Sequence, residues 1–157
     1  MTIEVSQYIR QAYASALSLI RINGSAIPVF DEIAFDGVML KDNPLGPKES
    51  AAECYIVLQA QTEGQAPVQT MCSNVINAYI SVRVVTSYKT GGNKNLCEKI
   101  TDQVFKAIFD GRHSTKLVFN TISVESVIFD NSNTLTEIAG ESNAFSKILT
   151  FNNIVTL

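Results

Sequence analysis

The chain has 157 residues, the size of one domain, with 46% hydrophobic residues, 17% charged residues and a formal net charge of −3. This composition is typical of a folded globular protein, unlike the charge-rich, apolar-poor sequences that stay disordered. The 12 lysines and arginines are scattered along the chain, so no dense cationic patch predicts tight binding of nucleic acid. We expect a single domain over residues 1–157 with its own hydrophobic core.

The cysteines and the N-terminal residues bear on the compartment. Cys54, Cys72 and Cys97 are odd in number and widely spaced, which fits neither a disulfide framework nor a zinc site. Residues 1–20 contain Glu4 and regularly spaced polar residues, unlike a signal peptide. No apolar run approaches the roughly 18 residues of a membrane helix. We therefore expect a protein made in a reducing cytosol, without export and without membrane association.

The first elements follow from apolar spacing. Apolar residues recur at steps of three and four, which predicts an amphipathic helix from about Thr2 to Arg21, with Asn23-Gly24 as its stop signal. Ile27-Pro28-Val29-Phe30 predicts a short strand. Because Pro28 has no N–H to donate, this strand is expected at a sheet edge.

Residues 34–52 are predicted to form a long loop. Turn-forming residues cluster at Asp36-Gly37 and in the stretch 43–47, yet the apolar residues Phe35, Val38, Met39 and Leu40 lie in the same segment. A long loop in a compact domain usually has a function.

A strand, a glycine turn and a helix form the most informative unit of the chain, residues 76–109. It follows a predicted strand at 54–58 that continues to Thr62. From Ile76 to Thr86 even-numbered apolar residues alternate with partly polar odd-numbered ones, which predicts a strand with one core face. Gly91-Gly92 then leads to Asn93, a candidate cap for a second amphipathic helix that ends near Phe109.

The remaining residues predict three strands, at 117–129, 134–138 and 145–155, separated by polar turns at 130–133 and 140–143. Between Val124 and Val127 the alternation changes phase, which predicts a bulge or bend. The order of elements predicts an α+β fold, with a mainly antiparallel sheet packed against two helices and with long loops.

The chain offers little that predicts catalysis. Gly91-Gly92-Asn93-Lys94 at a helix start lacks the Gly-Lys-Ser/Thr triplet of a phosphate loop. His113 is the only histidine and follows a turn, so a catalytic triad or a multi-histidine metal site is not expected. The acidic group Asp31, Glu32, Asp36 and Asp42 lacks the ligand spacing of a calcium loop. We therefore predict a protein that is not an enzyme, with no catalytic, cofactor-binding or metal-binding residues and no cofactor.

Several segments together resemble one family. They are the N-terminal helix, Pro28-Val29-Phe30-Asp31, Tyr55-Ile56-Val57-Leu58, the run from Val82 to Val84 through Gly91-Gly92 into the second helix, and Lys147-Ile148-Leu149-Thr150-Phe151. The chain resembles phage tail-terminator and tail-completion proteins of the lambda U type and related head-tail neck proteins.

The resemblance implies a virion protein that forms a homo-oligomeric ring, six-fold or twelve-fold, at the head-tail junction, neck or tail end. Such a ring terminates or joins the tail and contacts neck, portal or adaptor, or tail-tube proteins. It also implies a location in the tail or neck of the virion, after assembly in the host cytoplasm. DNA would only pass through the channel, and the acidic balance of the chain (pI about 5.1) is compatible with sliding.

Under this interpretation the apolar loop residues Phe35, Val38, Met39 and Leu40 are the candidate interface with a neighbouring subunit or ring. The alternative is that they fold back onto their own domain and cover the sheet. A different functional class also stays open: a small intracellular α+β enzyme or ligand-binding domain with its cleft near Gly91-Gly92.

Overall fold

The computed structural model describes residues 5–41, 51–65, 75–110, 114–139 and 142–156. Ten elements follow one another along the chain: α1 (Val5–Leu17), β1 (Arg21–Ile22), β2 (Ser25–Ala26), β3 (Val29–Asp31), β4 (Val38–Lys41), β5 (Ala51–Gln65), β6 (Val75–Tyr88), α2 (Asn95–Ile108), β7 (Ser123–Ala139) and β8 (Ser142–Thr156). Thr2, the predicted start of the first helix, lies outside the described residues.

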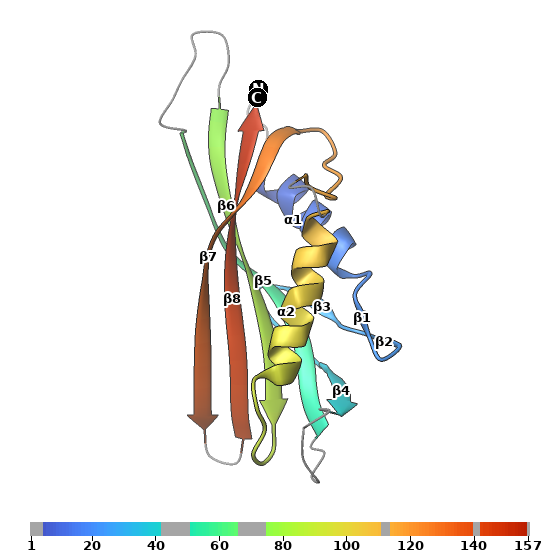
Figure 1. The fold of residues 1–157 in the computed structure, drawn as a ribbon. Helices are drawn as coiled ribbons and strands as arrows, with labels where there is room; N and C mark the ends of the chain where they lie inside the picture. Colours follow the sequence, from blue (N-terminus) through green and yellow to red (C-terminus); the bar gives the residue numbers. More distant parts are fainter. Residues whose placement is uncertain (1–4, 42–50, 66–74, 111–113, 140–141, 157) are drawn as a thin grey trace.

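One mixed sheet carries the fold, with strands in the order β3-β5-β6-β8-β7 and with β4 paired to the outer edge of β5. All these pairs are antiparallel except β3–β5, which is parallel. Both helices lie on the same side of the sheet (Figure 1), where α2 contacts β6 and β8 and α1 contacts β3, β5 and β6. The predicted α+β class is confirmed.

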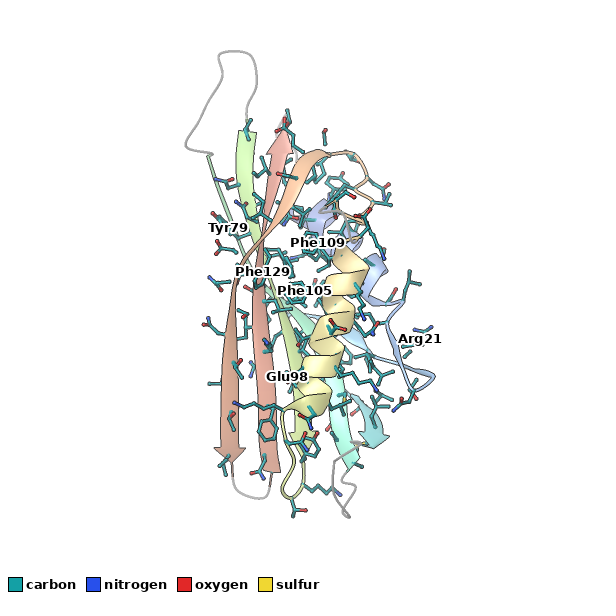
Figure 2. The ribbon with its side chains drawn as sticks, viewed as in Figure 1. Arg21, Tyr79, Glu98, Phe105, Phe109 and Phe129 are labelled. Carbon is teal, nitrogen blue, oxygen red and sulfur yellow. The ribbon has the colours of Figure 1, made fainter. Side chains whose placement is uncertain are left out.

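Strand β6 shows that one face of the sheet is more deeply buried than the other. Its even-numbered side chains from Ala78 to Tyr88 point to the helices and are buried, as the alternation predicts. Tyr79, by contrast, lies on the side of the sheet away from the helices (Figure 2). The helix-covered face, together with the inner faces of α1 and α2, forms the hydrophobic core.

A buried polar network ties α1 to the sheet. The Tyr13 hydroxyl donates to Asn153 Oδ1 at 2.8 Å, and Asn153 Nδ2 donates to the carbonyl oxygen of Ala78 at 3.0 Å. Burial raises the pKa of the Tyr13 phenol, although the hydrogen bond to Asn153 opposes this effect. Because each side-chain polar atom in this series of hydrogen bonds has a partner, the network fixes the position of α1 over β6 and β8.

Aromatic rings fasten α2 at its C-terminal half. Phe105 contacts Phe129 with ring centroids 5.0 Å apart and Phe151 at 6.0 Å, and both contacts are edge-on. Figure 2 shows Phe105 and Phe129 close together between α2 and β7. At the other end of the helix the N-cap is Lys94 and not the predicted Asn93, although Asn93 Oδ1 accepts the N–H of Asn95 at 2.9 Å.

The first helix is shorter than predicted. It ends at Leu17, and Asn23-Gly24 does not act as its stop signal. Instead these two residues, with φ of 51° and 82°, form the two-residue turn between β1 and β2. Two consecutive positive φ values are what a tight hairpin requires, which explains Asn-Gly at this place. The predicted strand 27–30 is β3, shifted by one to two residues, and it lies at a sheet edge as expected.

Two predictions of loops and turns are wrong. The segment 34–52 contains β4, which pairs with β5 from Val38↔Cys54 to Lys41↔Ala51. The predicted turn at 130–133 lies inside β7, which runs unbroken as one strand, whereas the predicted strand residues 117–122 precede it. The predicted irregularity near 124–127 is confirmed as a register shift between Val124 and Ser126, and a second shift follows between Phe129 and Asn131.

Candidate functional site

The four residues predicted as an interface divide into two groups. Phe35 is 79% exposed and Met39 is 58% exposed, whereas Leu40 is 5% exposed and belongs to the hydrophobic core. Val38 is half-buried against that core. Side chains alternate along β4, so Val38 and Leu40 cover their own sheet while Met39 points outward. Only Phe35 and Met39 remain available to a partner.

These two residues belong to a surface that we call the edge segment, residues 31–39, at the β3–β4 edge of the sheet. The segment also presents Ile33, which is 69% exposed. The ring of Phe35 lies against Phe30 with centroids 6.1 Å apart, and Phe30 in turn contacts Tyr55 at 6.2 Å. Both contacts are edge-on, so the segment rests on the sheet while most of Phe35 stays uncovered.

Gly37 anchors the edge segment to β5. Its N–H donates to Glu53 Oε1 at 2.9 Å. A Cβ at this position would lie 2.6 Å from Glu53 Cγ and 2.8 Å from the carbonyl oxygen of Cys54, so only glycine fits without displacing backbone. The segment is therefore held close to the strand, and its exposed apolar residues are presented from a fixed base.

The acidic residues of the edge segment differ in their ion pairs. Arg10 of α1 forms ion pairs with both Asp31 and Glu32. The exposed Asp36 has no hydrogen bond or ion pair to any described residue, and Asp42 lies outside the described part of the chain. Among the described residues, no group of three histidine, cysteine or acidic side chains is close enough to hold a metal ion.

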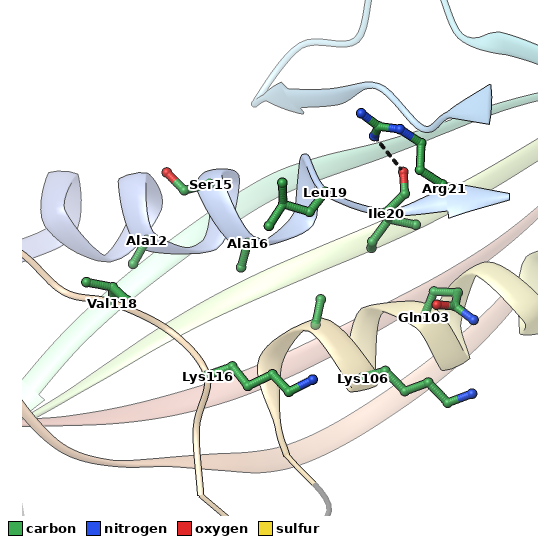
Figure 3. Close-up of a pocket in the computed structure, with 11 residues that line it drawn as sticks. Ala12, Ser15, Ala16, Leu19, Ile20, Arg21, Gln103, Lys106, Lys116 and Val118 are labelled. Carbon is green, nitrogen blue, oxygen red and sulfur yellow. Dashed lines mark hydrogen bonds between the residues drawn. The ribbon is translucent and has the colours of Figure 1, made fainter. Parts of the chain in front are cut away.

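A cleft of about 620 Å³ lies between α1, α2 and the segment 116–118 (Figure 3). Small side chains line it where the two helices face each other, at Ala12 and Ala16 on α1 and at Ala107 on α2. Leu19 and Val118 also line it, and each is 76% exposed. Exposed large apolar residues beside an apolar hollow are typical of a surface that another molecule covers.

The charged residues that line this cleft are all positive. Arg21, Lys106 and Lys116 line it, and no acidic residue is among the lining residues that the structure describes. Lys106 Nζ lies 2.9 Å from an Asp102 carboxylate oxygen, and Arg21 donates to the carbonyl oxygens of Ser18 and Ile20. Lys116 has no such partner among the described residues and remains available to an anion. Sequence reasoning missed this cleft.

The opposite edge of the sheet, strand β7, forms a third exposed surface. Its side chains from Asn131 to Ile138 are all exposed, and no other described strand pairs with its outer edge. The large apolar residues on it are Ile128, Phe129, Leu135 and Ile138, interspersed with the acidic residues Glu125, Asp130 and Glu137. Glu137 lies 3.6 Å from Arg83 of β6.

At the alternative site near Gly91-Gly92, both glycines are exposed and Gly92 lies against a buried side chain. A Cβ on Gly92 would lie 2.4 Å from the ring of Tyr88, which is fully buried, and Asn143 Nδ2 donates to the Gly91 carbonyl oxygen at 3.0 Å. The turn is thus packed against its own strands. His113 and Cys72 lie outside the described residues.

The two described cysteines are buried. Cys54 is fully buried at the start of β5, and Cys97 is 3% exposed on α2. Burial raises the pKa of the Cys97 thiol to about 11, although Lys147 and Thr86 oppose the shift. A neutral, covered thiol is a poor nucleophile, so this cysteine packs as a small hydrophobic residue. None of the described helices is long and apolar enough to cross a membrane.

Comparison with known proteins adds a likeness of fold. No protein-family model matches the chain, and no curated protein matches its sequence. A chain in the solved structure described as "Virion of native gene transfer agent (GTA) particle" matches with a TM-score of 0.59 and 17% sequence identity. The match covers 99% of this chain and 100% of that chain. This chain therefore shares its fold, from one end to the other, with a polypeptide of that virion.

Proposed function

We propose that this protein is a structural, non-enzymatic virion subunit that forms a ring at the head-tail junction, neck or tail end and there terminates or joins the tail. The observation that carries this proposal is the likeness of fold to a chain of the gene transfer agent virion. Because the match extends over nearly all of both chains, it concerns the complete α+β domain and not one shared hairpin.

The exposed apolar surfaces support assembly into a ring. A ring requires two different patches on each copy, so that one copy's first patch contacts the next copy's second patch. The described surface offers three separate apolar places: the edge segment, the α1–α2 cleft and strand β7. Monomeric proteins seldom leave several such places uncovered, whereas a subunit buries them against its neighbours.

The proposed partners are further copies of the chain, six or twelve to a ring, and the adjacent neck, portal or adaptor, or tail-tube proteins. DNA passes through the channel without being held. The net charge of −3 suits that task, because a wall that neutralised phosphates would bind the passing duplex. In this proposal the subunit acts in the tail or neck of the virion and reaches it from the host cytoplasm.

The test is the mass of the purified protein in solution, combined with negative-stain imaging. The wild type is expected to form annular particles at high concentration, and Phe35→Asp and Met39→Asp are expected to remain folded and to lose them. Gln11→Asp introduces the same charge at an exposed position of α1 and serves as the control. A wild type that stays monomeric at every concentration, even beside extracted virion parts, contradicts the proposal.

Imaging of particles distinguishes the position of the ring. Particles assembled with the Phe35→Asp variant are expected to have overlong tails if the ring terminates the tube, or heads separated from tails if it joins the neck. Particles that assemble normally with a ring-deficient subunit contradict both positions.

A further inference from the structure

We propose that the edge segment of one copy docks into the α1–α2 cleft of the next copy. The inference rests on the ring proposed above and names the two surfaces that meet in it. The segment supplies Ile33 and Phe35 as apolar anchors, and the cleft supplies the hollow between Leu19 and Val118 that receives them.

Size and shape fit this pairing. The cleft of about 620 Å³ is within the range of about 300–1,000 Å³ for pockets that enclose a compact ligand. Its alanines leave room for large side chains, and the edge segment presents two of them within three residues. Because Gly37 and the Phe30 contact already hold the segment in place, docking costs less conformational entropy than ordering a free loop.

Charge decides between the possible recipients of the edge segment. Phe35 is followed by Asp36, whose carboxylate has no partner among the described residues. Strand β7 presents Glu125, Asp130 and Glu137, so it would place like charges against Asp36. The cleft presents Arg21, Lys106 and Lys116 and is therefore complementary. Lys116 is the natural partner of Asp36, since both lack one within the described part of their own chain.

The segment does not fill the cleft of its own chain. Arg10 reaches Asp31 and Glu32 from one flank of α1, whereas Ala12 and Ala16 face α2 from the other flank. At about 100° per residue, positions 10 and 12 differ by about 200° around the helix. The helix thus separates the two surfaces, and their contact joins different copies head to tail, which is the arrangement that closes a ring.

A cross-linking experiment tests this contact directly. Asp36→Cys and Lys116→Cys are combined in a Cys72→Ser background, where the remaining thiols of Cys54 and Cys97 are buried. A short bismaleimide is expected to link successive copies and to give a ladder that stops at the ring's copy number. Each single-cysteine variant is the control and is expected to give no ladder. Rings seen by imaging without a ladder in the double-cysteine variant overturn the docking and leave the ring standing.

Substitutions at the two surfaces provide a second test of the docking contact. Leu19→Asp and Val118→Asp change exposed residues of the cleft and are expected to abolish rings, while Ile138→Asp on β7 leaves them intact. Lys116→Asp alone and Asp36→Lys alone should each raise the protein concentration at which rings form about fivefold or more, and the double exchange should restore it. Rings that survive Leu19→Asp but disappear with Ile138→Asp overturn the inference in favour of β7. A monomeric wild type instead refutes the ring itself.

Discussion

Two neighbouring residues of β4 provide the sharpest test of how the edge segment is built. Leu40→Ala removes three carbons from a side chain that is 5% exposed and packed in the core. At about 0.8 kcal/mol per buried carbon the transfer contribution is about 2.4 kcal/mol, and an incompletely collapsed cavity raises the total to about 3 kcal/mol. Met39→Ala removes a side chain that is 58% exposed, so we expect a loss of less than about 1 kcal/mol.

Urea denaturation followed by far-UV circular dichroism measures both values, since the chain has no tryptophan for fluorescence. With an m-value of about 2 kcal/mol/M, Leu40→Ala should lower the midpoint by about 1.5 M and Met39→Ala by less than about 0.5 M. The m-value itself should not change. Equal losses for the two variants, or a larger loss for Met39→Ala, would mean that β4 is shifted by one residue, because a one-residue slip exchanges the two faces of a strand.

The same pair separates folding from assembly. Met39→Asp places a charge in solvent and should disturb only contacts between copies. Leu40→Asp places an unpaired charge in the core and should unfold the monomer. Residues 35–40 therefore differ in role: Val38 and Leu40 hold the segment to the sheet, whereas Phe35 and Met39 are exposed and accessible to the proposed partner.

Three further predictions concern the rest of the fold. Tyr13→Phe leaves Asn153 Oδ1 buried without its donor, so thermal or urea unfolding should show a loss of about 1–3 kcal/mol, and Tyr8→Phe on the same helix should show much less. Gly92→Ala combines a φ of +97° with a clash against the Tyr88 ring. It should therefore destabilise the fold more than Gly91→Ala, whose new Cβ meets nothing within 4 Å. Equal unfolding midpoints for the two variants would contradict this packing. Since the thiol of Cys97 has a raised pKa of about 11 in the folded state, its contribution to stability is complete below about pH 8.5 and is lost as the pH rises towards 11; urea midpoints measured across this interval should fall less in Cys97→Ala than in the wild type.

The regular elements with a strong period could be predicted from the sequence. Strand β6 and helix α2 each pair a continuous apolar face with clear end signals, and the structure places both within a few residues of the expected bounds. The bulge near Val124 was also accessible, because a change of phase in the alternation requires an extra residue in the strand.

Strand β7 could not be predicted as one element, for a physical reason. From Asn131 to Ile138 both of its faces are exposed, so neither face selects apolar residues, and residues 130–133 within it have the composition of a polar turn. The antiparallel pairing with β8 keeps these residues extended. Strand β8 is near in sequence, but its composition differs from theirs. Strand β4 was hidden in the same way, between turn-forming residues, and its pairing to β5 became visible only in three dimensions.

The candidate functional site, too, could be predicted only in part from the sequence. Exposed apolar residues in a turn-rich segment indicated Phe35 and Met39, but the alternation that buries Leu40 depends on a strand that was not expected. The cleft had no local signal at all. Ala12, Ala16 and Ala107 are ordinary helix residues until α1 and α2 lie beside each other, and the cationic residues around them come from three separate segments.

The energetics of the proposed contact favour a closed ring over a pair of copies. Ile33 and Phe35, already partly covered, can together bury apolar area worth only about 3–4 kcal/mol, whereas association costs about 4–15 kcal/mol in lost freedom of motion. A single contact between two copies is therefore weak even with its ion pairs. In a ring every copy makes two such contacts, and the last one forms within an existing chain of copies at high effective concentration. Open intermediates of the proposed ring should therefore stay rare, so subunits should remain dispersed at low concentration and should form closed rings above a threshold concentration.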